Sequence, residues 1–258
     1  MEPSVLLRHS NKLMRATHSI SYSYPLSGLP NFTLNDDVNT RTRAPPVQIA
    51  AAWVRQYPSA HSPLKGTANP LLNLSQGAPG YLPPRIFTDR IAREGSAGNP
   101  HAYTSGLGEP ALREAVATNI NEFYRTGGTL SAANVAITCG CNMAFAASIA
   151  AIASRGDSVI LPYPWYFNHE MTLTAMGINV IPVPADQPDG TVDLEKIRAA
   201  MTDRVRAVVV VTPNNPRGTV YPAESLAAIY RICGESRVAL VLDETYVSVA
   251  NELSRVRH

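Results

Sequence analysis

Lysine is scarce in this sequence. Its 258 residues include only Lys12, Lys65 and Lys196, and arginine supplies most of the positive charge. The formal net charge is only +2, and no basic stripe stands out along the chain. Because binding to a phosphate backbone depends on clustered positive charge, the sequence argues against a nucleic-acid-binding protein.

Cysteines are few as well, at positions 139, 141 and 233. They form no CxxC spacing and have no matching His or Cys pair, which argues against a structural zinc site and favours a reducing compartment. No apolar run approaches the roughly 20 residues that a membrane-spanning helix needs. With 45% hydrophobic and 16% charged residues, the composition is that of a globular protein able to bury a core.

The first 45 residues differ from the rest of the chain. From Pro3 to Asn35 there is no Asp or Glu, while arginines and serines are present. This composition is typical of a disordered extension, but it also matches a mitochondrial transit peptide. We therefore expect a cytoplasmic protein, with a mitochondrial location as the alternative.

From Pro46 onward the pattern is globular and alternates between strands and helices. Residues 110–125 have the spacing of an amphipathic helix. Strands are predicted at 135–138, 158–162, 179–183, 206–212 and 238–244. Helices are predicted at 142–154, 166–176, 193–201 and 222–233, with Gly177 and Gly234 as C-terminal caps. Since 206–212 and 238–242 are apolar on both faces, the pattern predicts a mostly parallel sheet in a three-layer α/β/α domain.

Ligands of parallel sheets bind at the carboxyl ends of the strands, so the residues after each strand are candidates. The first predicted strand is followed by Gly140, Cys141 and Asn142, where free N–H groups at a helix start would bind a phosphate. An ordinary strand-to-helix turn explains these residues equally well. The second strand is followed by Tyr166 among other aromatics, which would stack on a planar ring or pack in the core.

Two further strand ends carry polar side chains. Asn215 lies in a rigid turn before Pro216, where its amide can donate a hydrogen bond or simply stabilise the turn. Asp243 ends a buried strand, so its carboxylate needs a cationic partner or a shifted pKa. A pyridinium nitrogen would be such a partner, and Tyr246 could reach an adjacent phenolic oxygen. The four strand ends together suit pyridoxal 5'-phosphate (PLP).

Six motifs give the chain a resemblance to the class I/II aminotransferases, which are fold-type I PLP-dependent enzymes. The motifs are NLSQGAPGY (73–81), YTSGLGEPALREAV (103–116), ITCGCNMAF (137–145), PYPWYFNH (162–169), VTPNNPRGT (211–219) and VLDETY (241–246). The resemblance extends from about Pro46 to Val247. It implies transfer of an amino group from an amino acid to a 2-oxo acid, with residues 46–247 forming a partial large domain of this fold that includes an N-terminal small-domain segment.

The resemblance also implies roles for individual residues. The backbone N–H groups of Gly140, Cys141 and Asn142 would bind the cofactor's phosphate, and Tyr166 would stack on its ring. Asp243 would keep the pyridine nitrogen protonated, so that the ring can accept electrons from the substrate.

Four further assignments follow from the same resemblance. Asn215 and Tyr246 would share the ring oxygen of the cofactor. Tyr103 would reach the phosphate in a neighbouring subunit, which implies a homodimer, and Gly77 would lie near the substrate carboxylate. Arg217 stands where the family more often has a small hydroxyl residue. Because the cofactor contact comes from Asn215, this difference does not affect that contact.

Two features of the family are missing from this sequence. The resemblance implies a Schiff-base lysine on the next strand, and then a C-terminal small domain with an arginine that binds the substrate carboxylate. The sequence contains neither; Lys196 belongs to a surface-type helix, and residues 248–258 form a divergent tail. We therefore expect this polypeptide by itself to be inactive.

Several alternatives stay open at this point. A second PLP reaction, by a lyase or an aminocyclopropane-carboxylate-synthase-like enzyme, would use the same cofactor motifs. A non-catalytic truncated product would keep them without turnover, while a nucleotide-binding sheet has only the weak SGLGEP pattern in its favour. The family's strand order places two later strands between the fifth strand and the first. That order would leave an apolar edge at 238–242, which predicts poor solubility.

Overall fold

The computed structural model of the protein describes residues 41–56, 73–77, 80–96, 103–125 and 128–248. The expected N-terminal extension, up to residue 40, and the tail from residue 249 lie outside the described residues. Helices α3 (Pro46–Gln56) and α4 (Arg85–Ser96) bury no side chain, and α5 (Pro110–Tyr124) buries only Ala117. In the ranges that the structure describes, no helix is long and apolar enough to cross a membrane.

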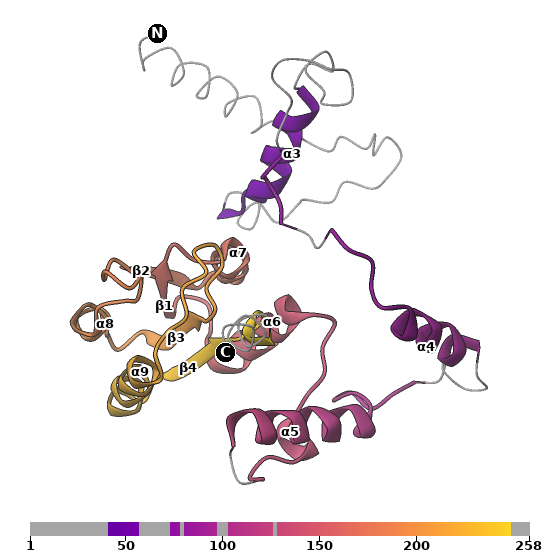
Figure 1. Cartoon of the computed structure of the whole chain (residues 1–258). Coiled ribbons are helices and arrows are strands. Elements are labelled where there is room, and N and C mark those ends of the chain that lie inside the picture. Colours follow the sequence, from indigo (N-terminus) through magenta and orange to yellow (C-terminus); the bar gives the residue numbers. More distant parts are fainter. Residues whose placement is uncertain (1–40, 57–72, 78–79, 97–102, 126–127, 249–258) are drawn as a thin grey trace, which may run out of the picture. The chain divides into compact units, whose positions relative to one another are not determined.

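Four parallel strands form one sheet in the order β2-β1-β3-β4 (Figure 1). They are β1 (Ser158–Tyr163), β2 (Asn179–Pro184), β3 (Val205–Val211) and β4 (Ala239–Asp243). All three strand pairs are parallel, and β3 pairs with β4 from Ala207 opposite Ala239 to Val211 opposite Asp243. The carboxyl ends of all four strands therefore lie at the same edge of the sheet.

Helices cover both faces of this sheet. Because successive side chains of a strand point to opposite faces, Val208 and Val210 of β3 pack with α8 (Leu194–Ala200) and α9 (Ala223–Ser236). Val209 of the same strand packs in a second cluster with α6 (Cys141–Ile152) and α7 (Phe167–Met176). Each fully buried aliphatic side chain contributes roughly 1.5–3 kcal/mol. The predicted three-layer α/β/α arrangement is confirmed.

The predicted strand at 135–138 is wrong for the described structure. These residues follow the short 3₁₀ helix η3 (Ala132–Asn134) but pair with no described strand. The N–H group of Ile137 donates instead to the carbonyl of Leu107, at 2.9 Å. An apolar β-branched segment becomes a strand only where a neighbour can complete its ladder, and no described strand lies beside this one.

The two predicted helix caps had different outcomes. Gly177 caps α7 in a left-handed conformation (φ 73°), and its N–H group donates to the carbonyls of Leu173 and Thr174, so this prediction is confirmed. The prediction for Gly234 is wrong, because α9 continues to Ser236 and Arg237 takes the left-handed position (φ 54°). Cys233 is buried against the sheet, which holds the last turn of α9 in place despite the glycine's cost of about 1 kcal/mol.

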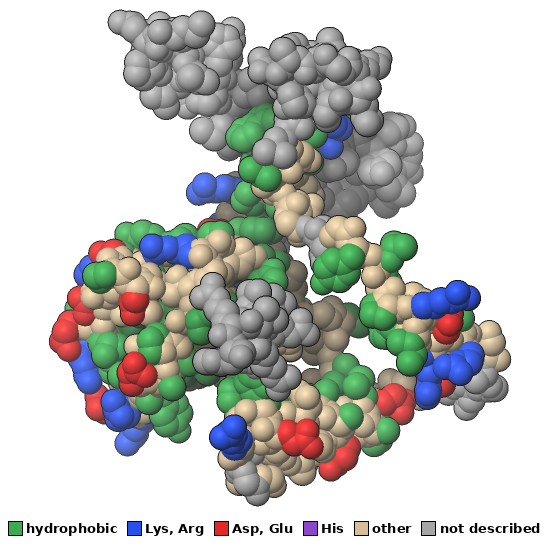
Figure 2. Space-filling model, viewed as in Figure 1, with side chains coloured by type: hydrophobic (Ala, Val, Ile, Leu, Met, Phe, Trp, Pro, Cys, Tyr) green, Lys and Arg blue, Asp and Glu red, His purple; other side chains and the backbone are tan. Residues whose placement is uncertain are grey.

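The outer surface of the α8–α9 layer carries both signs of charge (Figure 2). Arg198 of α8 pairs with Glu235 of α9 at 2.7 Å, and Lys196 pairs with Asp186 at 2.7 Å. These pairs are exposed, so each adds little to stability. Lys196 is thus a surface residue of α8, as its sequence context predicts.

Strand β4 gives a prediction about solubility, because it is paired only with β3 among the described strands and Leu242 is 40% exposed. Unpaired apolar edges promote association, and a lysine on the edge opposes it. We expect Leu242→Lys to raise the protein concentration at which light scattering of the purified chain begins. Val220→Lys is the control, since Val220 is 58% exposed in a loop. An equal gain from both variants would contradict a role for the edge.

Candidate cofactor site

The candidate site is centred on the carboxylate of Asp243, at the carboxyl end of β4. Asp243 is buried, with 8% of its surface exposed. Its position is fixed by the sheet, because the N–H group of Thr212, just after β3, donates to the Asp243 carbonyl at 2.9 Å. One carboxylate oxygen, Oδ1, accepts hydrogen bonds from the backbone N–H and the hydroxyl of Thr245, at 3.1 and 2.6 Å.

The other carboxylate oxygen of Asp243 faces a buried histidine. His169 Nε2 lies 3.1 Å from Asp243 Oδ2, and only 2% of the histidine side chain is exposed. The imidazole stacks on Phe145 of α6, with ring centroids 4.1 Å apart, and meets Tyr166 edge-on at 5.4 Å. Its Nδ1 atom is buried and has no hydrogen-bond partner in the described part of the chain. Packing from two helices therefore fixes the ring against the carboxylate.

Hydrogen bonding decides the charge of Asp243. Burial by itself would raise the pKa of this carboxyl. The hydrogen bonds from His169 and Thr245 outweigh burial and hold the pKa well below its usual range. Asp243 is therefore an ionised carboxylate near neutral pH, as a partner for a cationic group must be.

The amino end of α6 lies beside this carboxylate. Gly140 precedes the helix with φ 86°, a conformation that side chains disfavour, and α6 begins at Cys141. The N–H groups of Cys141 and Asn142 belong to the first turn, where no helical acceptor exists, and no other acceptor is found among the described residues. Cys141 Sγ lies 3.6 Å from Asp243 Oδ1. The amino terminus of a helix and a buried carboxylate are thus neighbours.

The structure brings some of the sequence-predicted residues together and leaves others apart. Cys141 contacts Asp243 directly, and Tyr166 is connected to it through His169. Asn215 is half-buried in the turn after β3, and Tyr246 is 43% exposed in the turn after β4. Gly77 and Tyr103 are both exposed, and their predicted roles stay predictions.

His169 is the residue that the sequence analysis missed. Its side chain lies three positions after Tyr166, on the first turn of α7. Residues three apart share a face of a helix, so a histidine at this spacing after a strand-end aromatic was the available signal. Nothing in the sequence alone shows that this histidine reaches a residue 74 positions further along the chain, because that contact depends on the strand order.

Arg217 turns away from the carboxylate. Its guanidinium Nη1 donates to the carbonyl of Ala185, just after β2, and its backbone N–H donates to the side chain of Asn214 at 3.0 Å. The amide of Asn215 remains available. The unusual arginine therefore stabilises the turn and leaves the site unobstructed.

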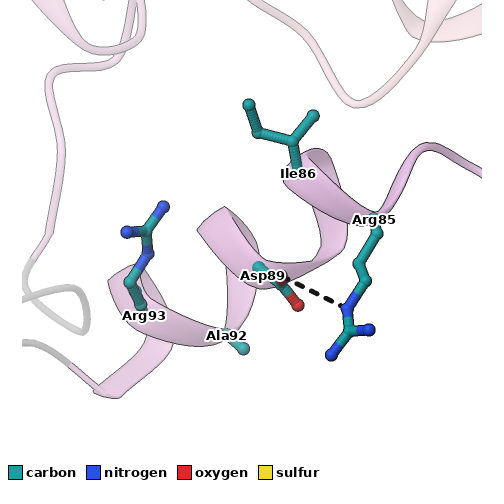
Figure 3. Close-up of a pocket in the computed structure, with 5 residues that line it drawn as sticks. All are labelled: Arg85, Ile86, Asp89, Ala92 and Arg93. Atoms are coloured by element: carbon teal, nitrogen blue, oxygen red, sulfur yellow. Dashed lines mark ion pairs between the residues drawn. The ribbon is translucent and has the colours of Figure 1, made fainter.

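A hollow on α4 is a poor alternative site (Figure 3). It is lined by Arg85, Ile86, Asp89, Ala92 and Arg93, all from one helix. The ion pair between Arg85 Nε and Asp89 Oδ2 is 3.6 Å long, and its side chains are 92% and 59% exposed. Polar groups from a single exposed helix do not converge on a ligand, unlike those around Asp243.

Comparison with known proteins identifies the family of the chain. Residues 69–257 match the sequence model of the aminotransferase class I and II family. The chain is 32% identical over 213 residues to the valine–pyruvate aminotransferase of Mycobacterium tuberculosis, covering 83% of this chain and 53% of that protein. It is 28% identical over 193 residues to a probable kynurenine–oxoglutarate transaminase of Saccharomyces cerevisiae, covering 70% and 43%.

Solved structures give the same result. Aspartate aminotransferase from Thermus thermophilus superposes with a TM-score of 0.69 at 27% identity, covering 83% of this chain and 53% of that one. The putative kynurenine aminotransferase of Saccharomyces cerevisiae, at 24% identity, shares the fold with a TM-score of 0.74 and covers 84% and 52%. The chain therefore belongs to the class I and II aminotransferase family. It spans about half the length of the relatives that it matches.

Replacing His169 tests how the buried pair contributes to stability. His169→Phe keeps a ring against Phe145 but removes the hydrogen bond to a buried carboxylate. Depriving a buried acceptor of a hydrogen-bond donor costs about 1–3 kcal/mol, so we expect urea denaturation at pH 7 to show a loss of at least this size. A His169→Gln control restores an N–H donor and should recover part of the loss.

The same variant predicts a pH dependence. Because the folded-state pKa of Asp243 is depressed, its stabilising contribution is present above the ordinary aspartate pKa of about 4 and is lost as the pH falls through the folded-state value. The difference in unfolding free energy between wild type and His169→Phe should therefore shrink in acid. A difference that stays constant from pH 7 to pH 3 would contradict the pairing.

Proposed function

We propose that this chain forms the cofactor-binding part of a PLP-dependent aminotransferase, which transfers an amino group from an amino acid to a 2-oxo acid. The observation that supports this most directly is the buried, ionised Asp243 at a strand end, beside the amino end of α6. An ionised carboxylate in a buried position is energetically costly, and such groups are often found where a cation binds. The family to which the chain belongs supplies the reaction class.

The residues of the site fit this cofactor in charge and in donor type. The N–H groups of Cys141 and Asn142 would bind the phosphate, joined by that of Gly140 if it gave up its 2.8 Å hydrogen bond to the carbonyl of Thr138. Asp243 would accept a hydrogen bond from the protonated ring nitrogen. Tyr166, at the start of α7, would stack on the ring. A helix terminus contributes about 0.3–1 kcal/mol toward an anion, and charge-assisted hydrogen bonds add to it.

The roles of the remaining predicted residues rest on the resemblance to the family, because the described contacts do not include them. Asn215 and Tyr246 would share the ring oxygen, as in the family that the chain resembles. Asn215 follows β3, the neighbour of β4, and Tyr246 follows β4 itself. Gly77 would lie near the substrate carboxylate. Tyr103, which is exposed in this chain, would reach the cofactor of a second subunit in a homodimer.

The bound cofactor would act as the electron sink for the negative charge that develops at the substrate's α-carbon. The residues of this chain support that chemistry by holding a proton at one atom. Asp243 would keep the ring nitrogen protonated as long as the carboxylate stays ionised, and the hydrogen bonds from His169 and Thr245 keep it ionised. His169 is thus a positioning residue, whose loss would alter the charge of Asp243 and so act on the cofactor indirectly.

Titration of the purified full chain with PLP tests the proposal, followed by the cofactor's absorbance and fluorescence. We expect saturable binding, and we expect Asp243→Asn to weaken it at least about tenfold, which corresponds to about 1.4 kcal/mol. Asp157→Asn is the matched control. Asp157 is also a buried carboxylate, but it precedes β1 at the opposite end of the sheet and pairs with Arg206 at 3.3 Å.

A second ligand, pyridoxal, tests the two ends of the site separately. Pyridoxal, which lacks the phosphate, should bind more weakly than PLP and should remain sensitive to Asp243→Asn. Equal affinity for the two ligands would count against a phosphate site at α6. If the folded wild-type chain binds neither ligand, the proposed function is wrong.

A further inference from the structure

The turn after β4 carries a side chain that fixes the carboxylate of Asp243. Thr245 donates to Asp243 Oδ1 from its backbone N–H group and from its hydroxyl, at 3.1 and 2.6 Å. The turn is closed by the N–H group of Val247, which donates to the carbonyl of Glu244 at 2.9 Å. Because Thr245 lies only two residues after Asp243, the conformation of this turn decides whether both hydrogen bonds to the carboxylate form.

A side chain from a distant helix reaches the same turn. The hydroxyl of Tyr124, the last residue of α5, donates to Oε1 of Glu244, although 120 positions separate the two residues in the chain. Burial raises the pKa of Tyr124, and the hydrogen bond with Glu244 and its charge raise it further. The phenol therefore remains a protonated donor at and above neutral pH. The proposed function assigns no role to either residue.

Helix α5 is itself held by contacts that do not involve β4. The side chain of Asn121 donates to the carbonyl of Leu130 at 2.8 Å and accepts from the N–H group of the same residue at 3.1 Å. Arg113 Nε donates to the carbonyl of Val135 at 2.7 Å. These contacts fix α5 to the segment of chain that leads into α6. Tyr124 therefore extends to the turn after β4 from a helix that is anchored elsewhere.

We propose that Tyr124 and Glu244 are positioning residues of the cofactor site. Their hydrogen bond holds the turn in which Thr245 lies, and Thr245 fixes the rotation of the Asp243 carboxylate. Neither residue touches the cofactor, and both act through Thr245 on the group that would bind the ring nitrogen. The inference rests on the proposed function, because it concerns the orientation of the same carboxylate.

The first test needs no ligand. Tyr124 is 46% exposed, so Tyr124→Phe should leave the fold intact and loosen only the turn. We expect the amide proton of Thr245 to exchange with solvent about three- to tenfold faster in this variant, the factor that one hydrogen bond of ordinary net strength supplies. The measurement is amide hydrogen exchange by NMR. The amide of Val209, in the core strand β3, is the internal control and should not change.

The second test compares PLP with its deaza analogue, in which a CH group replaces the ring nitrogen. Because Asp243 acts on that nitrogen, Tyr124→Phe should weaken the binding of PLP to the purified full chain by about three- to tenfold. The same substitution should leave the affinity for the deaza analogue unchanged. A general disturbance of the site would weaken the binding of both ligands equally, so this comparison separates positioning of Asp243 from a purely structural role.

Variants of the hydrogen-bond partner complete the test. Glu244→Gln keeps an acceptor for the phenol and should bind PLP like the wild type, whereas Glu244→Ala should match Tyr124→Phe. The double variant Tyr124→Phe/Glu244→Ala should bind no more weakly than either single variant, as expected of two residues that act through one contact. Tyr230→Phe is the matched control, because Tyr230 is a 67% exposed tyrosine of α9, on the sheet face opposite to α6 and α7.

The outcomes separate this inference from the proposed function. If Tyr124→Phe binds PLP as tightly as the wild type, weakens both ligands equally or leaves the exchange of the Thr245 amide unchanged, the positioning role is wrong and the proposed function is untouched. If the wild-type chain binds no PLP, the proposed function fails, and the positioning role fails with it. Should Tyr124→Phe not fold, Glu244→Ala measured against Glu244→Gln gives the same comparison. Faster exchange at Thr245 together with a loss of affinity confined to PLP would support the inference.

Discussion

The buried carboxylate of Asp243 is the constraint around which this part of the molecule is organised. Removing such a charge from water costs several kcal/mol, and only well-placed donors offset that cost. The donors come from separate segments: His169 from α7, Thr245 from the turn after β4, and the weak thiol donor Cys141 from the start of α6. Both helices that cover this face of the sheet, α6 and α7, therefore contribute a donor that stabilises the ionised form of Asp243. Burial of apolar surface holds α6 and α7 on the sheet, while Asp243 fixes where their first turns must lie.

The sheet makes this arrangement possible because it brings together residues that are far apart in the chain. His169 follows β1, and Asp243 ends β4, with β3 between these strands. A parallel sheet places the carboxyl ends of all its strands at one edge, and each helix that returns to the opposite edge starts from there. The first turn of α7, which follows β1, consequently lies at the strand ends. The start of α6 lies there as well, as the 3.6 Å distance between Cys141 Sγ and Asp243 Oδ1 shows. Only a short connection between β1 and α7 is needed to place His169 beside Asp243.

The strongest elements of the fold were predictable from the sequence because their signals are local. The apolar β-branched segments of β1 and β3 are buried on both faces, as their composition indicates, and Asp243 was identified from its place at a strand end. Two errors have a common cause in tertiary structure. Residues 135–138 have strand composition but no described neighbour, and Gly234 is carried within α9 because the buried side chain of Cys233 outweighs a local preference. His169 escaped notice because its partner is a residue that only the strand order brings near.

The polarity of the site gives a stronger argument about its ligand than any single residue does. At one end is the amino terminus of α6, with two N–H groups that lack acceptors among the described residues; at the other is a carboxylate kept ionised by hydrogen bonds. The 3.6 Å contact between Cys141 Sγ and Asp243 Oδ1 shows that these ends are adjacent. A simple anion would be repelled by Asp243, and a simple cation would be disfavoured by the positive end of the helix dipole. The complementary ligand carries an anionic group and a protonated nitrogen on one small frame, with a flat face for Tyr166. A pyridinium ring that carries a phosphate satisfies all three requirements together.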